Sequence, residues 1–322
     1  MTPLLEAVNV TKHFHLGGPF SPGGRQTVHA LDGVSLRVER GETLGLVGES
    51  GCGKSTLGRC LIRLYDLTAG QVRFEDIDIT SMPERKLRPL RPRMQMVFQD
   101  PYSSLNPRRR VGDLIAEPLR VHTRMNAAAV RDRLRELVGL VGLRVEHLER
   151  YPHEFSGGQR QRIGIARALA LDPALVIADE PVSALDVSVQ AQVVNLMMDL
   201  QQRLSLTYVF VAHDLSVVRQ ISTRTAVMYL GQIVELGPSE AVFERPLHHY
   251  TSALIAAVPR IGGDHAAKRV LGGEPPNPLM PPPGCRFHTR CPRAENRCRV
   301  EVPVLEALDG PHAVACHFPV GT

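Results

Sequence analysis

Residues 48–55 carry the pattern GxxxxGK(S/T), which is typical of loops that bind nucleotide phosphates. Glycines let such a loop curl so that successive N–H groups point inward, and a helix expected from Lys54 adds its positive dipole end. The Lys54 ammonium then bridges the β- and γ-phosphates, and the Ser55 hydroxyl ligates Mg²⁺. An ordinary glycine-rich turn is the alternative. We expect ATP and Mg²⁺ here, bound by Gly48, Ser50, Gly51, Cys52, Gly53, Lys54, Ser55 and Thr56.

Two carboxylates, Asp179 and Glu180, close the apolar stretch 174–179, which reads as a buried strand. A carboxylate in this place organises Mg²⁺ in ATPases with a phosphate loop, and this is the role expected of Asp179. Glu180 is expected to polarise the attacking water as a general base. Such a pair at a strand end is about as often a solvated turn. The phosphate loop upstream favours the functional interpretation.

A second anion-binding element is expected at Ser156-Gly157-Gly158-Gln159, where a serine and two glycines begin a helix. One chain has no evident way to use both helix ends on the same phosphate. If two chains pair head to tail, the second helix end would cap the γ-phosphate held by the first. The pattern therefore suggests a dimer joined by nucleotide.

The elements that must position these residues alternate between strands and helices. Strands are expected at 4–10, 34–38, 43–47, 174–179 and 207–214. Helices are expected from Lys54 and over 127–140, 157–170 and 187–204. This alternation, with polar residues at the carboxyl ends of strands, predicts an α/β fold with a mostly parallel sheet and a site along that edge.

The pattern changes after about residue 240. The stretch 272–284 holds six prolines, which favour extended polyproline geometry and a linker. We therefore expect a nucleotide-binding domain at 1–240, with a helical subdomain at about 100–170. A linker and extension at 241–284 and a cysteine-rich, metal-binding tail at 285–322 would follow it.

Four of the six cysteines crowd into the last 38 residues, namely Cys285, Cys291, Cys298 and Cys316. Tight zinc knuckles are absent, whereas four thiolates on looser loops suit a [4Fe–4S] cluster whose charge nearby arginines would offset. Zinc, or metal-free thiols or a disulfide, are the alternatives, and His288, His312 and His317 could substitute as ligands. Cys52 and Cys60 are expected to be packing residues, with an oxidation-prone Cys52 as the alternative.

Charge and hydropathy exclude some classes of protein. The net charge is +5, and the basic residues are scattered rather than gathered in one block, so nucleic-acid binding is not indicated. No apolar stretch approaches the roughly 18 residues needed to span a bilayer, and the N-terminus has no targeting pattern. We expect the chain in the cytosol, where thiols stay reduced.

Taken together, the motifs resemble those of an ABC-transporter ATP-binding subunit over roughly residues 4–260. The resemblance adds Gln99, Ser183-Ala184-Leu185-Asp186 and His213 to the patterns above. It implies an ABC cassette with an antiparallel β subdomain and a helical signature subdomain. Gln99 would sense Mg²⁺ and the attacking water, His213 would contact the γ-phosphate, and Asp186 would act across a dimer interface. It also implies an aromatic residue that stacks on adenine: Phe14, with His13 and Phe20 as alternatives and a core role as another interpretation of Phe14.

Three longer stretches, 96–108, 177–196 and 246–259, resemble the ATPases of bacterial dipeptide/oligopeptide importers, and more specifically the second of their two paralogues. Members usually read His-Pro-Tyr where this chain has His248-His249-Tyr250. The resemblance implies a heterodimer with a paralogous ATP-binding subunit, two transmembrane permease subunits and, indirectly, a peptide-binding protein. It also implies a C-terminal iron–sulfur site and a peripheral location on the cytoplasmic face of the bacterial cell membrane. A soluble ABC ATPase acting on DNA or ribosomes is the competing hypothesis, and an exporter ATPase is a third.

Overall fold

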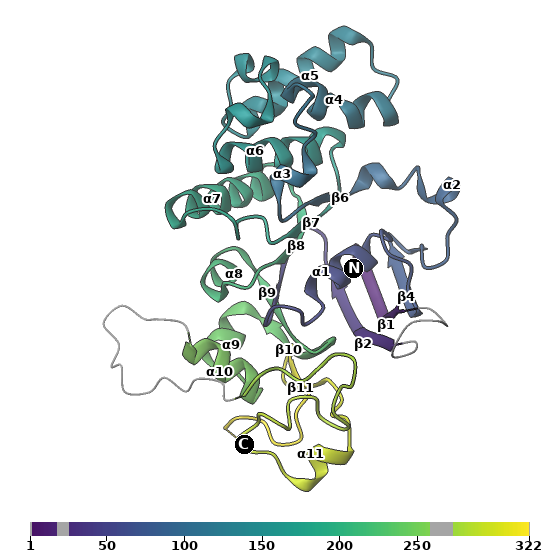
Figure 1. Cartoon of the computed structure of the whole chain (residues 1–322), viewed down its shortest axis with the longest axis vertical. Coiled ribbons are helices and arrows are strands. Elements are labelled where there is room, and N and C mark those ends of the chain that lie inside the picture. The colour runs from purple at the N-terminus through teal and green to yellow at the C-terminus, as the bar shows by residue number, and fades with distance from the viewer. Residues whose placement is uncertain (1, 18–25, 258–272, 322) are drawn as a thin grey trace. The chain divides into compact units, whose positions relative to one another are not determined.

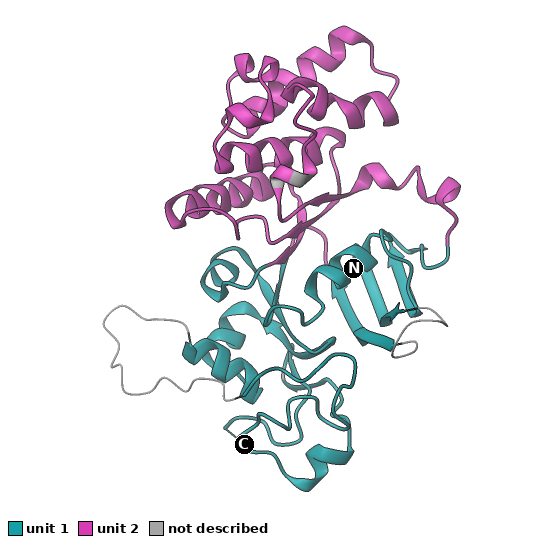
Figure 2. Cartoon of the chain, viewed as in Figure 1, with its two compact units in different colours: residues 1–38, 44–81, 212–322 teal, residues 39–43, 82–211 magenta. Residues whose placement is uncertain are grey.

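A computed structural model describes residues 2–17, 26–257 and 273–321 of the 322-residue chain (Figure 1). The chain divides into two compact units, which Figure 2 shows in different colours. Unit 1 comprises residues 1–38, 44–81 and 212–322, and unit 2 comprises residues 39–43 and 82–211. Each unit is thus assembled from segments that are far apart in the sequence.

One sheet of unit 1 is antiparallel, with the strand order β2-β1-β4-β5. Its strands are β1 (Leu5–Leu16), β2 (Gln26–Val38), β4 (Ala69–Phe74) and β5 (Ile77–Asp78). The expected strands 4–10 and 34–38 correspond to β1 and β2, but both observed strands are longer than expected. The pairing of β1 with β2 continues as far as Leu16 and Gln26. Leu5, Ala7 and Val10 are buried on β1, while the turn residues 18–25 lie outside the described part of the chain.

A second set of strands in unit 1 carries the phosphate loop. β3 (Thr43–Val47) runs parallel to β9 (Arg224–Tyr229), and β10 (Gln232–Pro238) pairs antiparallel with β9. The tail contributes β12 (His312–Val314), which pairs with β10, and β11 (Glu306–Asp309), which pairs with β12. All five residues of β3 are buried, as expected of a parallel strand covered on both faces. The tail therefore extends the same sheet as the strands beside the phosphate loop.

The helices of unit 1 are short. They are α1 (Lys54–Leu61), α8 (Leu215–Ile221), α9 (Ser239–Glu244), α10 (His249–Ala257) and α11 (Asn296–Val300). Helix α1 begins at Lys54, as the sequence predicts, and buries Leu57, Cys60 and Leu61. Helix α11 belongs to the tail and buries Cys298.

Unit 2 contains three parallel strands in the order β8-β7-β6, within the residues described. These are β6 (Met94–Val97), β7 (Leu175–Asp179) and β8 (Thr207–Val211). The structure ends β8 at Val211, three residues before the expected end of that strand. The parallel pairing confirms the expected α/β fold, with Asp179 at the carboxyl end of β7.

The other elements of unit 2 are helical. They are α2 (Glu84–Leu87), α3 (Pro101–Ser104), α4 (Val111–His122), α5 (Ala127–Leu140), α6 (Gly157–Ala168), α7 (Val187–Leu204) and the 3₁₀ segments η1 (Arg91–Arg93), η2 (Val145–Glu149), η3 (Pro152–Glu154) and η4 (Leu169–Leu171). Helices α5 and α7 have the predicted bounds. Helix α6 ends two residues early and is followed by η4, which is capped by Asp172 with a φ of 50° just before Pro173. Within the described ranges, every helix is too short or too polar to cross a bilayer.

Candidate nucleotide site and cysteine cavity

The phosphate loop follows β3, and two of its glycines are required by close backbone approaches. Gly48 has a φ of 151°, and a Cβ atom there would lie 2.2 Å from the Met228 carbonyl oxygen. Gly53 has a φ of 106°, and a Cβ would lie 2.4 Å from the Ala30 carbonyl oxygen. Any larger residue would push the loop away from the strands beneath it. The curl that the sequence predicts is therefore built into the packing.

The Lys54 side chain is buried at the start of α1 and bonded to the loop itself. Its Nζ donates to the carbonyl oxygens of Gly48 at 2.8 Å and Glu49 at 3.0 Å. The ammonium thus lies at the loop where the N–H groups of the α1 N-terminus begin. A cation beside exposed N–H donors makes an anion-binding site. Ser50 and Gly51 are exposed, whereas Ser55 and Thr56 are half-buried.

Three candidate residues of unit 2 gather at the end of β7. Asp179 is 1% exposed. The neighbouring Glu180 is half-buried, and its Oε2 accepts a hydrogen bond of 2.8 Å from Nε2 of Gln99. Gln99 comes from the segment after β6, so the structure brings together two residues 81 positions apart. A carboxylate oriented by an amide can hold a water molecule and accept its proton.

The backbone of Glu180 is strained, with a φ of 46°. A non-glycine residue in the left-handed region needs support from its surroundings, and such strain gathers at functional sites. Here the Glu180 N–H donates to the Val211 carbonyl at 2.9 Å, and the Glu180 carbonyl accepts from the N–H and hydroxyl of Ser183. These bonds hold the Glu180 backbone in the left-handed conformation.

Ser156 caps the N-terminus of α6. Its Oγ accepts from the Gln159 N–H at 3.4 Å, and Oε1 of Gln159 accepts from the Ser156 N–H at 3.1 Å. This capping box stabilises the helix end. Gly158 is buried against α7, and a Cβ there would lie 2.3 Å from Cγ1 of Val189. Gly157 is exposed. The exposed helix end has no acidic residue in its first turn, which suits an anion.

For the remaining nucleotide-site candidates, the structure gives exposure and a few contacts. His213 is exposed after β8, and Asp186 is exposed at the N-cap of α7. The half-buried ring of Phe14 on β1 meets the Tyr65 ring edge-on at 5.6 Å, with the Lys12 ammonium 4.9 Å from its centroid. This contact fits the core role as well as it fits a stacking platform. Phe20 lies outside the described residues.

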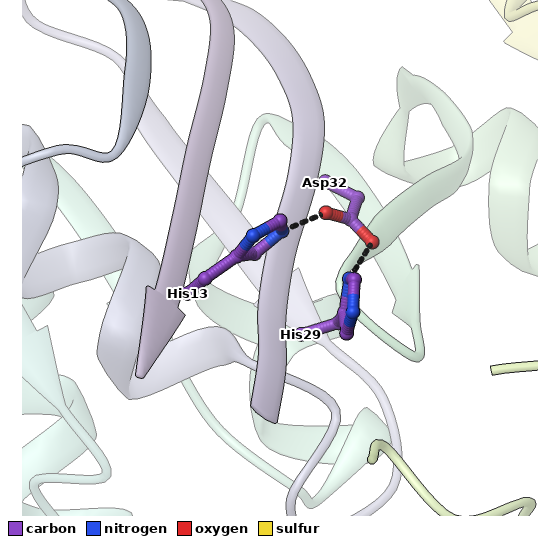
Figure 3. Close-up of side chains that lie close together, drawn as sticks. All are labelled: His13, His29 and Asp32. Carbon is purple, nitrogen blue, oxygen red and sulfur yellow. Dashed lines mark hydrogen bonds and ion pairs between the residues drawn. The ribbon is translucent and has the colours of Figure 1, made fainter. Parts of the chain in front are cut away.

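His13, the other alternative for stacking, belongs to a polar cluster with His29 and Asp32 (Figure 3). His13 Nε2 hydrogen-bonds one Asp32 oxygen, and His29 Nδ1 lies 3.2 Å from the other. The Arg286 guanidinium of the tail also pairs with Asp32. Burial raises the pKa of Asp32, but the bonds from His13 and Arg286 outweigh it and leave that pKa below its usual value. Arg286 already supplies the positive charge that this carboxylate needs, so the cluster serves as an ion-paired anchor for the tail.

The four tail cysteines line one cavity in unit 1. Its other lining residues are His248, His249, Phe287, His288, Arg293, His317 and Phe318. Among the described residues, no three of the cysteine sulfurs lie within 4.8 Å of one another. Four zinc-bound sulfurs would lie about 3.8 Å apart, given Zn–S bonds of about 2.3 Å. The donor set fits a soft metal centre, but the sulfurs as placed are not spaced as the ligands of a single zinc ion.

The open space at the centre of this cavity is about 10 Å³. That is room for about one water molecule, so the thiols must move apart to admit a cluster. Burial raises the pKa of Cys285 and Cys316 to about 11 and also raises that of Cys291. These thiols are therefore protonated at neutral pH and need a cationic centre to become thiolates.

Cys52 and Cys60 are buried, as expected of packing residues. Burial raises the pKa of both thiols, that of Cys60 to about 11. A thiol whose pKa is raised is poorly nucleophilic. The raised pKa of Cys52 thus counts against the oxidation-prone alternative.

Comparison with known proteins gives this geometry a context. Residues 31–183 match the family described as ABC transporter, and residues 234–298 match the oligopeptide/dipeptide transporter C-terminal region. The chain is 52% identical over 319 residues to the oligopeptide transport ATP-binding protein AppF of Bacillus subtilis (strain 168), across 98% of this chain and 97% of that protein. It is also 51% identical over 316 residues to the dipeptide transport ATP-binding protein DppF of Escherichia coli (strain K12), across 98% and 94%.

The chain belongs to the ATP-binding proteins of the oligopeptide/dipeptide ABC transporters. A solved dimeric structure of the ATP-binding cassette MJ0796, in a post-hydrolysis state bound to ADP and Pi, is 29% identical with a TM-score of 0.66. The match covers 73% of this chain and 98% of the cassette. The family and the fold expected from the motifs are thus confirmed, and the nucleic-acid alternative is not favoured.

One contact of this peptide-transporter ATPase has no counterpart in the sequence prediction. The guanidinium of Arg290 pairs with the carboxylate of Glu49, which is one of the variable positions of the phosphate loop. The Tyr250 hydroxyl accepts a hydrogen bond of 2.8 Å from the Glu49 N–H. Both partners are more than 200 residues away in the sequence. The crowding of arginines around the tail cysteines was the sole hint, and it pointed to a metal centre instead.

Proposed function

We propose that this chain hydrolyses ATP as the energy-coupling subunit of a bacterial ABC importer for dipeptides or oligopeptides. Family membership and the identity to peptide-transport ATP-binding proteins over nearly the whole chain support the peptide class. The single observation that carries the chemistry is the hydrogen bond between Gln99 and Glu180, next to buried Asp179. It supplies an oriented base in a chain that also has a phosphate loop.

In the proposed reaction, Lys54 and the N–H groups at the start of α1 bind the β- and γ-phosphates of ATP. Ser55 and Asp179 would ligate Mg²⁺, with Gln99 nearby, and the ion would neutralise phosphate charge when bound. A water oxygen attacks the γ-phosphorus while the bond from that phosphorus to the β,γ-bridging oxygen breaks. Glu180 accepts the water proton, and His213 stabilises the charge on the γ-phosphate oxygens. The products are ADP and inorganic phosphate.

The assembly proposed for this reaction is a head-to-tail dimer with a paralogous ATP-binding subunit. Ser156, Gly157, Gly158 and Gln159 of each chain would cap the γ-phosphate bound by the other, with Asp186 acting across the interface. The exposed N-cap of α6, with no acidic residue in the first turn of the helix, supports this role. Movement of the ATP-binding dimer would be transmitted to two permease subunits at the cytoplasmic face of the cell membrane. A peptide-binding protein would deliver the peptide to those permease subunits. Nucleic acid is not an expected partner.

Two further assignments concern ligands. Phe14 would stack on adenine, supported by a side chain that is only half-buried. Cys285, Cys291, Cys298 and Cys316 would hold a [4Fe–4S] cluster, with zinc as the alternative. Their gathering around one cavity supports a shared metal centre, and the absence of tight zinc knuckles supports the cluster.

The catalytic proposal is tested by Glu180→Gln in the assembled transporter. The amide keeps the size of the side chain and cannot accept the water proton, so turnover should fall at least 100-fold while ATP binding persists. Phosphate release and the binding of a fluorescent ATP analogue measure the two effects. Glu240→Gln, a change of the same type on the exposed surface of α9, should leave both unchanged. Undiminished phosphate release from the Glu180→Gln transporter would exclude Glu180 as the base.

A further inference from the structure

The phosphate loop carries a negative charge of its own at Glu49. Its carboxylate accepts two hydrogen bonds from Arg290, one of 2.7 Å to Oε2 and one of 3.0 Å to Oε1. This is a bidentate pair, the strongest geometry for an arginine and a carboxylate. The Arg290 side chain is 5% exposed and that of Glu49 is 25% exposed, so water screens the pair only in part.

Arg290 also contacts Tyr229, which belongs to a cluster of aromatic rings. Its guanidinium lies 5.9 Å from the ring centroid of Tyr229 and donates to the Tyr229 hydroxyl at 3.4 Å. The Tyr229, Tyr250 and Phe287 rings pack against one another with centroids 4.7 to 5.4 Å apart. An arginine with this support cannot easily swing away from the loop.

The tail segment that bears Arg290 is anchored at two other points of unit 1. Arg286 pairs with Asp32 and also donates to the Leu230 carbonyl. The Pro278 carbonyl accepts a hydrogen bond of 3.1 Å from the His29 N–H. These contacts fix the chain at Pro278 and at Arg286, before it reaches Arg290. The position of Arg290 therefore depends on the tail being folded.

The charge of Glu49 matters because ATP brings several negative charges to the same loop. An unpaired carboxylate beside the phosphates would repel them, and repulsion between like charges is strong where water is partly excluded. Glu49 also presents its carbonyl to Lys54 and its N–H to Tyr250. One guanidinium can thus neutralise the loop and hold its backbone in place.

We propose that Arg290 is a positioning residue of the phosphate loop, through which the cysteine-bearing tail sets the affinity of the cassette for ATP. Arg290 acts through Glu49 and does not touch the nucleotide. The inference rests on the proposed nucleotide site and adds to it a charge-balancing partner from the far end of the chain. It gives the tail a function in nucleotide binding whether or not the cysteines hold a metal.

The test is a double-mutant cycle on the full-length chain, with MgATP binding followed by a fluorescent ATP analogue. Arg290→Met keeps much of the side-chain volume and removes the charge, so it should weaken binding about tenfold. Adding Glu49→Gln to Arg290→Met removes the unpaired carboxylate, so the double variant should bind more tightly than Arg290→Met alone. Arg290→Lys should be intermediate, since a single ammonium replaces the bidentate pair.

Exposed Arg299 of α11 provides the matched control, and Arg299→Met should bind MgATP as the unaltered chain does. In the assembled transporter, Arg290→Met should raise KM for ATP and leave kcat within about twofold. If Arg290→Met does not fold, the comparison of Arg290→Lys with the Glu49→Gln, Arg290→Lys double variant carries the same test.

Two results would overturn the proposal: ATP affinity of Arg290→Met within twofold of the unaltered chain, or a double variant no better than its Arg290 single variant. The second result separates charge balance from mere damage to the tail, because removing the Glu49 charge cannot repair a misfolded tail. Failure of the unaltered chain to bind MgATP would instead count against the proposed function. The two failures are therefore distinguishable.

Discussion

At the scale of single residues, neighbours decide what each titratable group can do. Asp179 and Glu180 are adjacent in the sequence, yet one is buried at a strand end and the other reaches Gln99 from a strained backbone. The sequence predicted both roles because strand-end carboxylates after a phosphate loop form a specific pattern. The residues alone did not predict the Gln99 contact. Gln99 was assigned to the site only through the resemblance, and the contact forms because β6 and β7 lie side by side in the sheet.

His147 in η2 should make the stability of the chain depend on pH. Burial, followed by the charges of Arg144 and Arg150, lowers the pKa of His147 below its usual value of 6.5. The folded state therefore binds the proton more weakly than the unfolded state. The stability is fully present above about pH 6.5 and is lost as the pH falls below it, by at most about 1.4 kcal/mol per pH unit. Urea unfolding between pH 7 and 5 measures the slope.

The matched comparison is between His147→Gln and His153→Gln. His147 is buried, and its Nδ1 accepts a hydrogen bond of 3.3 Å from the Arg144 N–H, whereas His153 is exposed. His147→Gln should lower stability at pH 7 and flatten the slope, because the group that the unfolded state protonates is gone. His153→Gln should leave the slope as it is. Equal slopes in all three proteins would show that His147 is not the titrating group.

At the scale of elements, helix α6 contains a glycine that its packing against α7 requires. Gly158 lies against Val189 of α7, so a Cβ would meet Cγ1 at 2.3 Å. Gly164, two turns further along the same helix, has nothing within 4 Å of its Cβ position. The sequence indicated the glycines as part of an anion-binding motif. Only the packing shows that one of them is also a helix contact.

We expect Gly158→Ala and Gly164→Ala to change stability in opposite directions. The first forces α6 and α7 apart and should lower the free energy of unfolding by about 1–3 kcal/mol. The second replaces glycine by a better helix former in open space and should raise it by about 0.5–1 kcal/mol. Denaturant unfolding of the nucleotide-free chain measures both. Equal effects of the two changes would contradict the close contact between α6 and α7.

At the scale of the whole molecule, the tail is an integral part of unit 1 and contributes strands to its sheet. β12 pairs with β10, and His312 on β12 lies 2.8 Å from the carboxylate of Glu235, which is fully buried. The Glu235 carboxylate also accepts from the N–H groups of Leu247 and His248. These contacts join three separate stretches of the sequence. Strand β12 ends two residues before Cys316, which lines the cysteine cavity.

The metal content of the tail is the prediction at this scale. Chain purified without oxygen should contain iron and sulfide in about equal amounts, near four of each per chain, with little zinc. Cys291→Ser should lose most of the iron because it removes one of the four ligands, whereas Cys60→Ser, at a buried packing cysteine, should retain it. Elemental and sulfide analysis measures both variants. Zinc in place of iron, or unchanged iron in Cys291→Ser, would contradict the proposed ligand set.

By itself, the sequence determined the α/β class, the phosphate loop, the strand-end carboxylates and the capped signature helix. Each of these depends on residues that are neighbours along the chain, where spacing alone specifies geometry. Only the tertiary structure decided that Arg290 meets Glu49 across 241 residues, and that the four cysteines share one cavity. A long-range ion pair leaves no local sequence pattern, because its two residues become neighbours only when the tail packs beside the phosphate loop.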